Sequence, residues 1–226
     1  MKILIIDTET TGLDPATASV IELGAVLFDV ALRSPICQVS YLLPSLTNEA
    51  EFVNRIDPQL TMKCPDLTGP MAASFWAMVA EADYALAHNA AFDKKWFGEG
   101  GCLPAMPLRW ICSMEDVDWP LKTKRGRFSV MNLCVDYGVP VWNAHRALTD
   151  CIYLAEVMKR EPQLESVLLA ATQEKHVYAS LLPYARRQEC KDAGFIWNDI
   201  VPKAWAKRMT EAEASALDFE TIMVQQ

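Results

Sequence analysis

Apolar and polar positions along the chain predict an α/β domain built on a mixed sheet. Five short apolar runs have the length and residue types of strands: residues 2–6, 20–28, 37–43, 84–87 and 108–112. Apolar residues recur with helical spacing in three segments: 70–82, 128–137 and 144–159. The first three strands follow one another directly, whereas the later strands alternate with helices. This order predicts a five-stranded mixed sheet flanked by helices.

The pattern after residue 171 differs and predicts a separate, small α+β module. Its elements are expected in this order: a strand over 177–182, a helix over 185–193, a hairpin of 195–197 with 204–206, and a terminal helix over 211–220. Gly194 is placed to end the first of these helices. We therefore expect a first domain over 1–171 and a C-terminal module over 172–226 with an acidic tail.

Charge restricts the function classes less than the total suggests. The chain has 226 residues, 51% of them hydrophobic, so it can bury a full core. Its net charge of −8 by itself disfavours a nucleic-acid partner, which attracts basic surfaces. However, residues 1–118 carry 7 basic and 16 acidic side chains, whereas residues 172–209 carry 7 and 4. Where the charges lie therefore matters more than their sum.

The cysteines and the apolar runs disfavour several other classes. The seven cysteines are scattered and form no Cys-x-x-Cys pair, which disfavours both a disulfide framework and a zinc site. No apolar run approaches the ~20 residues of a membrane span, and the apolar run at the start of the chain is too short for a signal peptide. We expect a soluble, cytoplasmic protein with no membrane partner.

The first chemical motif is an acidic pair at the end of the first predicted strand. Asp7 and Glu9 lie two residues apart, so a strand would place both carboxylates on one face, where they can share a hard cation. With 14 Asp and 15 Glu in 226 residues, about one Asp-x-Glu pair is expected by chance. The pair therefore needs support from other motifs.

The second motif is Asn-x-x-Phe-Asp, directly after the strand over 84–87. It comprises Asn89, Phe92 and Asp93, and this combination is rare by chance in a chain of this composition. Asp93 would lie on the first helical turn and face the same end of the sheet as Asp7. The alternative is an ordinary helix start, in which Asn89 caps the helix and Phe92 packs.

The third motif is His-x-x-x-x-Asp, formed by His145 and Asp150 at the start of the helix over 144–159. Five residues on a helix rotate by about 500°, so the two side chains converge only if His145 lies in the loop or first turn. The alternative is a solvated helix start with an inward-facing aspartate. The three motifs in this order form a much stronger signal than any one of them.

Together these motifs resemble those of the DnaQ-like 3′–5′ exonucleases, in the DEDDh branch of the ribonuclease H-like fold. The resemblance covers roughly residues 3–160 and implies that Asp7, Glu9, Asp93 and Asp150 are the four acidic residues and His145 the general base. The sister branch has a tyrosine four residues before the last aspartate, where this chain has Arg146. The stretch 110–114 followed by Trp119-Pro120 also resembles bacterial exodeoxyribonuclease X.

Four clustered carboxylates repel one another, and divalent metal relieves this repulsion. Hard oxygen ligands select Mg²⁺ or Mn²⁺, and we expect two ions. Asp7 would bridge them, Glu9 and Asp150 would hold the ion that carries the attacking water, and Asp93 would hold the second. His145 would take the proton from that water.

The resemblance also implies a set of substrate-binding residues: Thr8, Thr10, Thr11, Leu13, Asn89 and Phe92. Thr10 and Thr11 would lie near the terminal sugar, Leu13 would wedge beside the terminal base, and Phe92 would line the groove. Leu13 and Phe92 could instead be ordinary core residues. His88, at the end of a strand, is expected to be a hydrogen-bonded structural histidine.

Two basic regions are candidates for contact with nucleic acid. Four cations precede the helix over 128–137 and could follow phosphates or be merely solvated: Lys122, Lys124, Arg125 and Arg127. In the C-terminal module, Trp197 and Trp205 are interleaved with six basic residues: Arg186, Arg187, Lys191, Lys203, Lys207 and Arg208. The alternative is that the two tryptophans form the core of the module.

The sequence thus predicts a metal-dependent 3′–5′ exonuclease that releases nucleoside 5′-monophosphates from single-stranded or frayed DNA. Within the same branch, the alternative is an exoribonuclease or oligoribonuclease. From another class, the alternative is a non-catalytic nucleic-acid-binding or polymerase-associated subunit. The oligomeric state is left open, with a homodimer among the allowed states.

Overall fold

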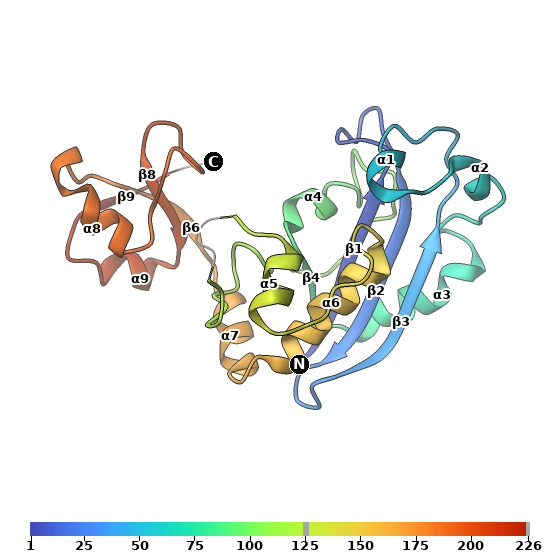
Figure 1. Cartoon of the computed structure of the whole chain (residues 1–226), viewed down its shortest axis with the longest axis horizontal. Helices are drawn as coiled ribbons and strands as arrows, with labels where there is room; N and C mark the ends of the chain where they lie inside the picture. The colour runs from blue at the N-terminus through green and yellow to red at the C-terminus, as the bar shows by residue number, and fades with distance from the viewer. Residues whose placement is uncertain (124–126, 225–226) are drawn as a thin grey trace. The chain divides into compact units, whose positions relative to one another are not determined.

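The computed structural model describes residues 1–123 and 127–224, which form two compact units divided between Ala171 and Thr172. Figure 1 shows both units, and each is described separately below. In the described ranges, no helix is long and apolar enough to cross a membrane.

The first unit is built on the mixed five-stranded sheet that the sequence predicts (Figure 1). Its strands are β1 (Lys2–Thr10), β2 (Val20–Asp29), β3 (Ser34–Leu42), β4 (Tyr84–Ala87) and β5 (Trp110–Cys112). Their order across the sheet is β3-β2-β1-β4-β5. The first three strands are antiparallel, whereas β1, β4 and β5 run parallel. The parallel strands place the chain that follows β4 at the same sheet end as the end of β1.

Helices cover both faces of this sheet. One face carries α5 (Val130–Asp136), α6 (Ala147–Arg160) and α7 (Leu164–Ala171). On the other face lie the 3₁₀ turn η1 (Pro70–Ala72) and α3 (Ala73–Glu81).

Three further helices are short. Two of them, α1 (Glu51–Asn54) and α2 (Pro58–Thr61), follow β3, and α4 (Ala90–Lys94) follows β4. Helices of four or five residues are too short to show a hydrophobic period, so the sequence pattern does not reveal them.

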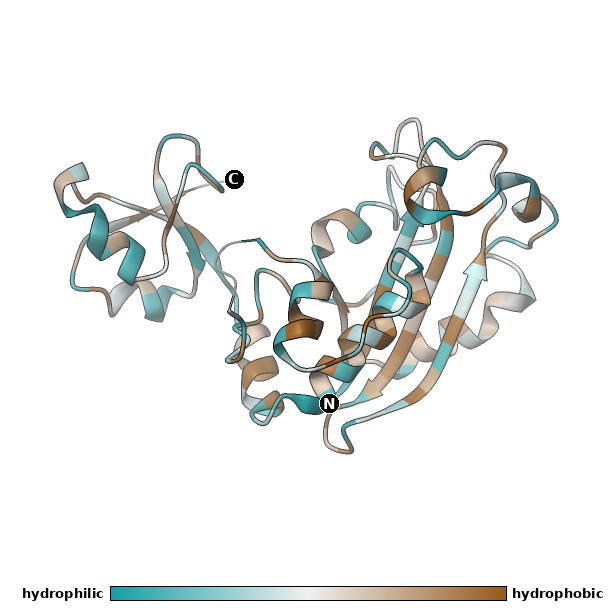
Figure 2. Cartoon of the chain, viewed as in Figure 1, coloured by the Kyte–Doolittle hydropathy of each residue, from teal (hydrophilic) through white to brown (hydrophobic). Residues whose placement is uncertain are grey.

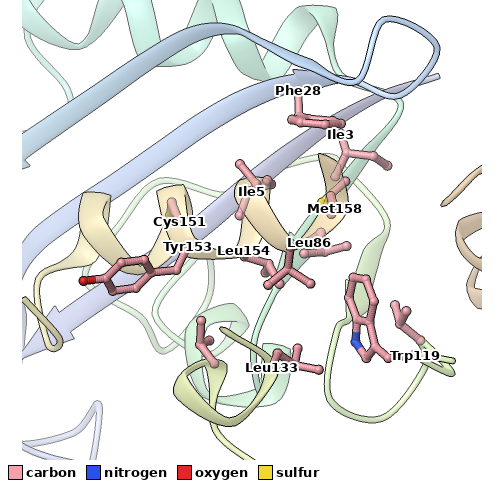
Figure 3. Packing of buried hydrophobic residues seen from close by; sticks show 14 of the residues in the cluster. Ile3, Ile5, Phe28, Leu86, Trp119, Leu133, Cys151, Tyr153, Leu154 and Met158 are labelled. Atoms are coloured by element: carbon pink, nitrogen blue, oxygen red, sulfur yellow. The ribbon is translucent and has the colours of Figure 1, made fainter. Parts of the chain in front are cut away.

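Alternate residues of β1 face the two helical layers. Ile3 and Ile5 are fully buried in a cluster with the α6 residues Tyr153, Leu154 and Met158 (Figure 3). The intervening Leu4 and Ile6 belong to the opposite cluster, with Phe75 and Met78 of α3. Removing this apolar surface from water is the main driving force for assembling the three layers. The same alternation directs the next odd-numbered residues, Asp7 and Glu9, toward the α6 side.

Strand β1 is longer than the apolar run that predicts it. The run ends at Ile6, but the strand continues to Thr10 and pairs with β2 along this whole length. Its polar residues are held by the ladder of backbone hydrogen bonds, which does not depend on apolar side chains. The acidic pair therefore lies within a central strand of the sheet.

The second unit is a small four-stranded antiparallel sheet with short helices. Its strands are β6 (His176–Ser180), β7 (Ile196–Trp197), β8 (Trp205–Met209) and β9 (Thr221–Met223), in the order β7-β8-β6-β9. Its helices are η2 (Tyr184–Arg186), α8 (Arg187–Asp192) and α9 (Glu211–Ser215). Buried Tyr178, Cys190, Phe195 and Met209 form its core.

The expected helix over 211–220 is wrong in its second half. Helix α9 ends at Ser215, and Leu217 and Phe219 pack on the core of the unit. The chain then forms β9, which pairs with β6. The Ala-rich composition favours a helix locally, but packing of Leu217 and Phe219 and strand pairing override this propensity.

Candidate active site

Asp7 and Glu9 lie on the same face of β1, half-buried, beside the antiparallel strand β2. In this register Asp7 is opposite Gly24 and Glu9 is opposite Glu22. The two carboxylates are therefore fixed by a central strand and not by a mobile loop, which favours a constant separation.

Gly24 allows helix α6 to approach the acidic pair. A Cβ atom at this position would lie 2.2 Å from the backbone nitrogen of Leu148, so only glycine fits here. The Cys151 thiol also donates to the Gly24 carbonyl at 3.4 Å. The first turn of α6 therefore packs directly on the backbone of β2, and this close approach brings Asp150 toward the face of β1 that carries Asp7 and Glu9.

The His145–Asp150 pair meets the structural demand that its spacing makes. His145 lies two residues before the first residue of α6, with a left-handed backbone φ of 63°. Its backbone N–H donates to Asp150 Oδ2 at 3.3 Å. One ligand atom each of Glu9, His145 and Asp150 lies within 4.8 Å of the others. Thus His145 occupies the loop, and its ring joins the carboxylates from outside the helix.

Glu22 anchors the start of α6 and is a residue that the sequence analysis missed. It is 1% exposed and accepts hydrogen bonds from Arg146 Nε at 3.0 Å, from an Arg146 terminal nitrogen at 2.7 Å and from the Ala147 N–H at 3.0 Å. This forked ion pair fixes the residue that follows His145. The available signal was a single charge within an apolar strand, because a buried charge requires a partner.

Asp93 reaches the site from α4 and is 2% exposed. Its Oδ1 accepts hydrogen bonds from the Thr8 backbone N–H at 3.0 Å and from the Thr8 hydroxyl at 2.8 Å. Asn89 occupies the N-cap position of α4 in a left-handed conformation, with φ of 66°, and its side chain makes no capping hydrogen bond. The simple capping explanation for Asn89 therefore fails.

The electrostatics of the site disfavour the charged forms of its carboxylates, chiefly through burial. Burial, followed by the neighbouring Asp93, Asp150 and Glu9, raises the pKa of Asp7 well above its ordinary value. Burial and Asp150 raise the pKa of Glu9 to about 8. Burial raises the pKa of Asp93 to about 7, although the hydrogen bonds from Thr8 act to lower it. Burial also raises the pKa of Asp150 to about 6. Each carboxylate is thus destabilised in its charged form.

The chain after β1 forms an exposed turn tied to α4. Leu13 is 78% exposed, which excludes a core role for it. Its carbonyl accepts a hydrogen bond from Lys95 Nζ, and the same ammonium lies 4.4 Å from the Phe92 ring centroid. Phe92 is partly buried and packs edge-on against Trp96. Lys95 thus links Leu13 to Phe92, a link that no sequence motif indicates.

The threonines of this region hold the backbone. The Thr10 hydroxyl donates to the Gly12 carbonyl at 2.7 Å, and the Thr11 hydroxyl accepts from the Ser19 N–H at 3.0 Å. The Thr10 carbonyl accepts from the Asn54 side chain at 3.2 Å, which ties α1 to the same turn. All three threonines, Thr8 included, are nearly fully buried.

His88 is held by hydrogen bonds, and two of the basic residues before α5 contact an aromatic ring or an acidic side chain. The two ring nitrogens of His88 hydrogen-bond Ser113 Oγ at 2.8 Å and the Phe128 carbonyl at 2.7 Å, as expected for a structural histidine. Lys122 Nζ lies 4.8 Å from the Phe128 ring centroid, and Arg127 lies 3.9 Å from Glu115. Lys124 and Arg125 lie outside the described residues.

Comparison with protein families matches residues 4–158, more than half of the chain, to the Exonuclease family. The chain belongs to this exonuclease family. Residues 176–224 match a second family, which is described as a domain of unknown function. A search of curated proteins finds no match to this exonuclease.

Solved structures of exonucleases share the fold. Exonuclease X in complex with 5′-overhanging duplex DNA is 25% identical, with a TM-score of 0.57, over 75% of this chain and 97% of that one. Escherichia coli exonuclease I with a dT13 oligonucleotide is 17% identical, with a TM-score of 0.54, over 79% of this chain and 48% of that one. A full-length 3′-exonuclease is 17% identical, with a TM-score of 0.59, over 73% of this chain and 82% of that one. The family match and the likeness to exonuclease X place the protein among the DnaQ-like 3′–5′ exonucleases, and the other two structures share the ribonuclease H-like fold.

The donor set of this exonuclease fits a divalent cation, on which DnaQ-like exonucleases depend. Asp150 Oδ1 is buried and has no hydrogen-bond partner among the described residues, so it has a lone pair free for a ligand. Its neighbours Asp7, Glu9 and Asp93 supply hard oxygen donors whose charged forms a cation would stabilise. These observations support metal binding at the Asp150 end of the cluster.

Proposed function

We propose that this exonuclease removes nucleoside 5′-monophosphates from the 3′ ends of DNA, from single strands or frayed duplex ends. The observation that carries the proposal is the convergence of Glu9, His145 and Asp150, with Asp7 on the same face of β1 as Glu9. Burial raises the pKa values of all three carboxylates, and neighbouring carboxylates, Glu22 among them, raise them further. A bound cation would stabilise the charged carboxylates of such a site and could also contact the phosphodiester of a substrate.

Asp7, Glu9, Asp93 and Asp150 would hold two Mg²⁺ or Mn²⁺ ions. When bound, these ions activate the attacking water and stabilise charge on the scissile phosphate. His145 is exposed at the edge of the cluster and would accept the proton of that water at a ring nitrogen. The backbone hydrogen bond from His145 to Asp150 keeps base and carboxylate together while the proton moves.

The substrate end would be held by the turn after β1 and by α4. Exposed Leu13 would pack against the terminal base, and partly buried Phe92 would pack against a sugar. Apolar contacts of this kind do not depend on the base sequence. Asn89 would line the same groove. Thr10 and Thr11 would contribute through the backbone that they fix, and Thr8 through the position of Asp93.

DNA is the preferred substrate in this proposal because of one comparison. Exonuclease X, a relative at 25% identity, is in complex with 5′-overhanging duplex DNA, and the match covers nearly all of that chain. The match to a 3′-exonuclease that recognises the histone mRNA stem-loop is 16% identical and shows the fold alone. The alternative that the experiment must distinguish is therefore an exoribonuclease.

The test measures 3′-end hydrolysis with labelled single-stranded DNA, frayed duplex DNA and RNA of the same sequence. We expect Mg²⁺-dependent release of 5′-mononucleotides from DNA, abolished by EDTA. Asp7→Ala and Asp150→Asn should lower kcat by about 10³-fold or more, and His145→Ala by about 10²–10⁴-fold. Asp118→Asn removes an exposed acid outside the cluster and is the matched control. Full activity of either carboxylate variant would refute the proposed active site. Faster hydrolysis of RNA than of DNA would refute the proposed preference for DNA.

A further inference from the structure

The C-terminal unit carries a continuous row of aromatic and cationic side chains. Tyr184, Arg187 and Lys191 are spaced three and four residues apart along η2 and α8, so they share one helical face. The Arg187 guanidinium lies 4.5 Å from the Tyr184 ring centroid, and Lys191 Nζ lies 5.9 Å from that of Trp205. The Trp205 and Trp197 rings follow, with centroids 5.6 Å apart. We call these five residues the aromatic–cation row.

The row is a surface feature and not the core of the unit. Tyr184 is 71% exposed and Trp197 is 48% exposed. Trp205 is partly buried against the core that Tyr178 and Phe195 help to form. The explanation that the two tryptophans together make the core therefore holds in part for Trp205 and fails for Trp197.

Among the described residues, the cations of the row have no acidic partner. Neither Arg187 nor Lys191 forms an ion pair within the described part of the chain, and each lies over an aromatic ring instead. The neighbouring Arg186 differs, because its guanidinium forms two hydrogen bonds, at 2.6 and 2.7 Å, with Glu189. The acidic residues of the tail lie in a separate segment, in and after α9. Figure 2 shows α8 as a predominantly hydrophilic helix.

We propose that this row binds single-stranded nucleic acid. Exposed aromatic faces stack on unpaired bases of any sequence, and unpaired cations between the rings attract the phosphates that connect those bases. A duplex hides its base faces, and an acidic protein partner would not need three aromatic rings in line with the cations. The site belongs to the second unit, so it does not depend on the hydrolytic chemistry proposed for the first.

The test measures the affinity of the full chain for fluorescein-labelled oligothymidylate by fluorescence anisotropy in EDTA, across a salt series. Arg187→Ala with Lys191→Ala should weaken binding about ten-fold and lower the salt slope by about 1.4, because each phosphate contact on a single strand contributes about 0.7. Tyr184→Ala and Trp197→Ala should each weaken binding about ten-fold, with little change in the slope.

Arg186→Ala is the matched control, since it removes a cation from the same helical segment that is already paired to Glu189. It should bind as the unmodified chain does. Equal affinities and slopes for the row variants and this control would overturn the proposal. An equal loss on blunt duplex DNA would overturn the stacking role.

Hydrolysis of thymidine 5′-(p-nitrophenyl phosphate) in Mg²⁺ separates this proposal from the catalytic one. This ester carries a single nucleotide and no strand to stack on the row, so the row variants should hydrolyse it at the unmodified rate. A chain that binds oligothymidylate through the row but fails to cleave the ester would refute the proposed function alone. A chain that cleaves the ester while its row variants bind normally would refute the row alone.

Discussion

At the residue scale, the site is organised by the electrostatic cost of placing acidic side chains together. Glu9 shows this most clearly, because its half-buried carboxylate lies near Asp150 of α6 and opposite Glu22 in the strand pair. Arg146 opposes this effect, but its guanidinium is already engaged by Glu22. The site therefore contains negative charge that no cation of the described chain neutralises directly.

Glu9→Gln should stabilise the metal-free protein at high pH. Burial and Asp150 raise the pKa of Glu9 from 4.5 to about 8. The folded state therefore binds its proton more tightly than the unfolded state, and stability falls as pH rises from about 4.5 to about 8. Each pKa unit corresponds to about 1.4 kcal/mol, reduced here by water around a half-buried group. In EDTA, the variant should gain Tm over the unmodified chain at pH 8 and little at pH 5.

Glu99→Gln is the control for this measurement, because it removes the same charge from an exposed position after α4. It should show no gain that grows with pH. If the two variants had the same pH profile of Tm, general charge reduction would explain the result, and the strained carboxylate would not.

The sequence indicates candidate acidic residues because the chemistry of such a site requires particular residue types at short spacings. The partners that position them are less visible. Glu22 and Arg146 lie more than a hundred residues apart, and Lys95 meets Leu13 only through the fold. Contacts of this kind leave no local pattern, so the structure is needed to find them.

At the element scale, the site depends on how closely α6 packs on β2. Gly24 sets this distance, because its missing side chain is replaced by the backbone of Ala147 and Leu148. The strands and long helices of the first unit follow from hydrophobic patterning, but this contact does not, since a glycine within a strand reads as a weakness of the strand.

Gly24→Ala should lower both stability and activity. The added Cβ would lie 2.2 Å from the Leu148 nitrogen, so helix α6 must move away from the strand. Overpacking of this kind costs about 1–3 kcal/mol. Displacing Asp150 by about 1 Å should lower kcat by about 10²-fold. Urea unfolding and exonuclease assays well below the Tm measure the two effects.

Gly69→Ala provides the comparison, because an added Cβ there meets no atom closer than 3.9 Å and the backbone φ of −82° suits alanine. It should retain normal stability and kcat. If the folded Gly24→Ala protein had the kcat of this control, the contact between α6 and β2 would not position Asp150.

At the scale of the whole molecule, the net charge of −8 has a local explanation. Four of the acidic residues converge at the end of the sheet, where a cation would serve both catalysis and folding. The basic residues of 172–209 form part of a different surface, in the second unit. The total charge therefore excludes only non-specific attraction of nucleic acid by the molecule as a whole.

Mg²⁺ should accordingly raise the Tm of the first unit's unfolding transition. A ligand that binds only the folded state stabilises it by about 2.7 kcal/mol at a hundred times its Kd. Asp150→Asn removes the carboxylate whose Oδ1 has no partner among the described residues, so it should reduce the Mg²⁺-dependent shift. Asp118→Asn should retain the full shift. Calorimetry at Mg²⁺ concentrations that support cleavage measures this, and an unchanged Tm for the unmodified chain would mean that the carboxylate cluster does not bind the ion as proposed.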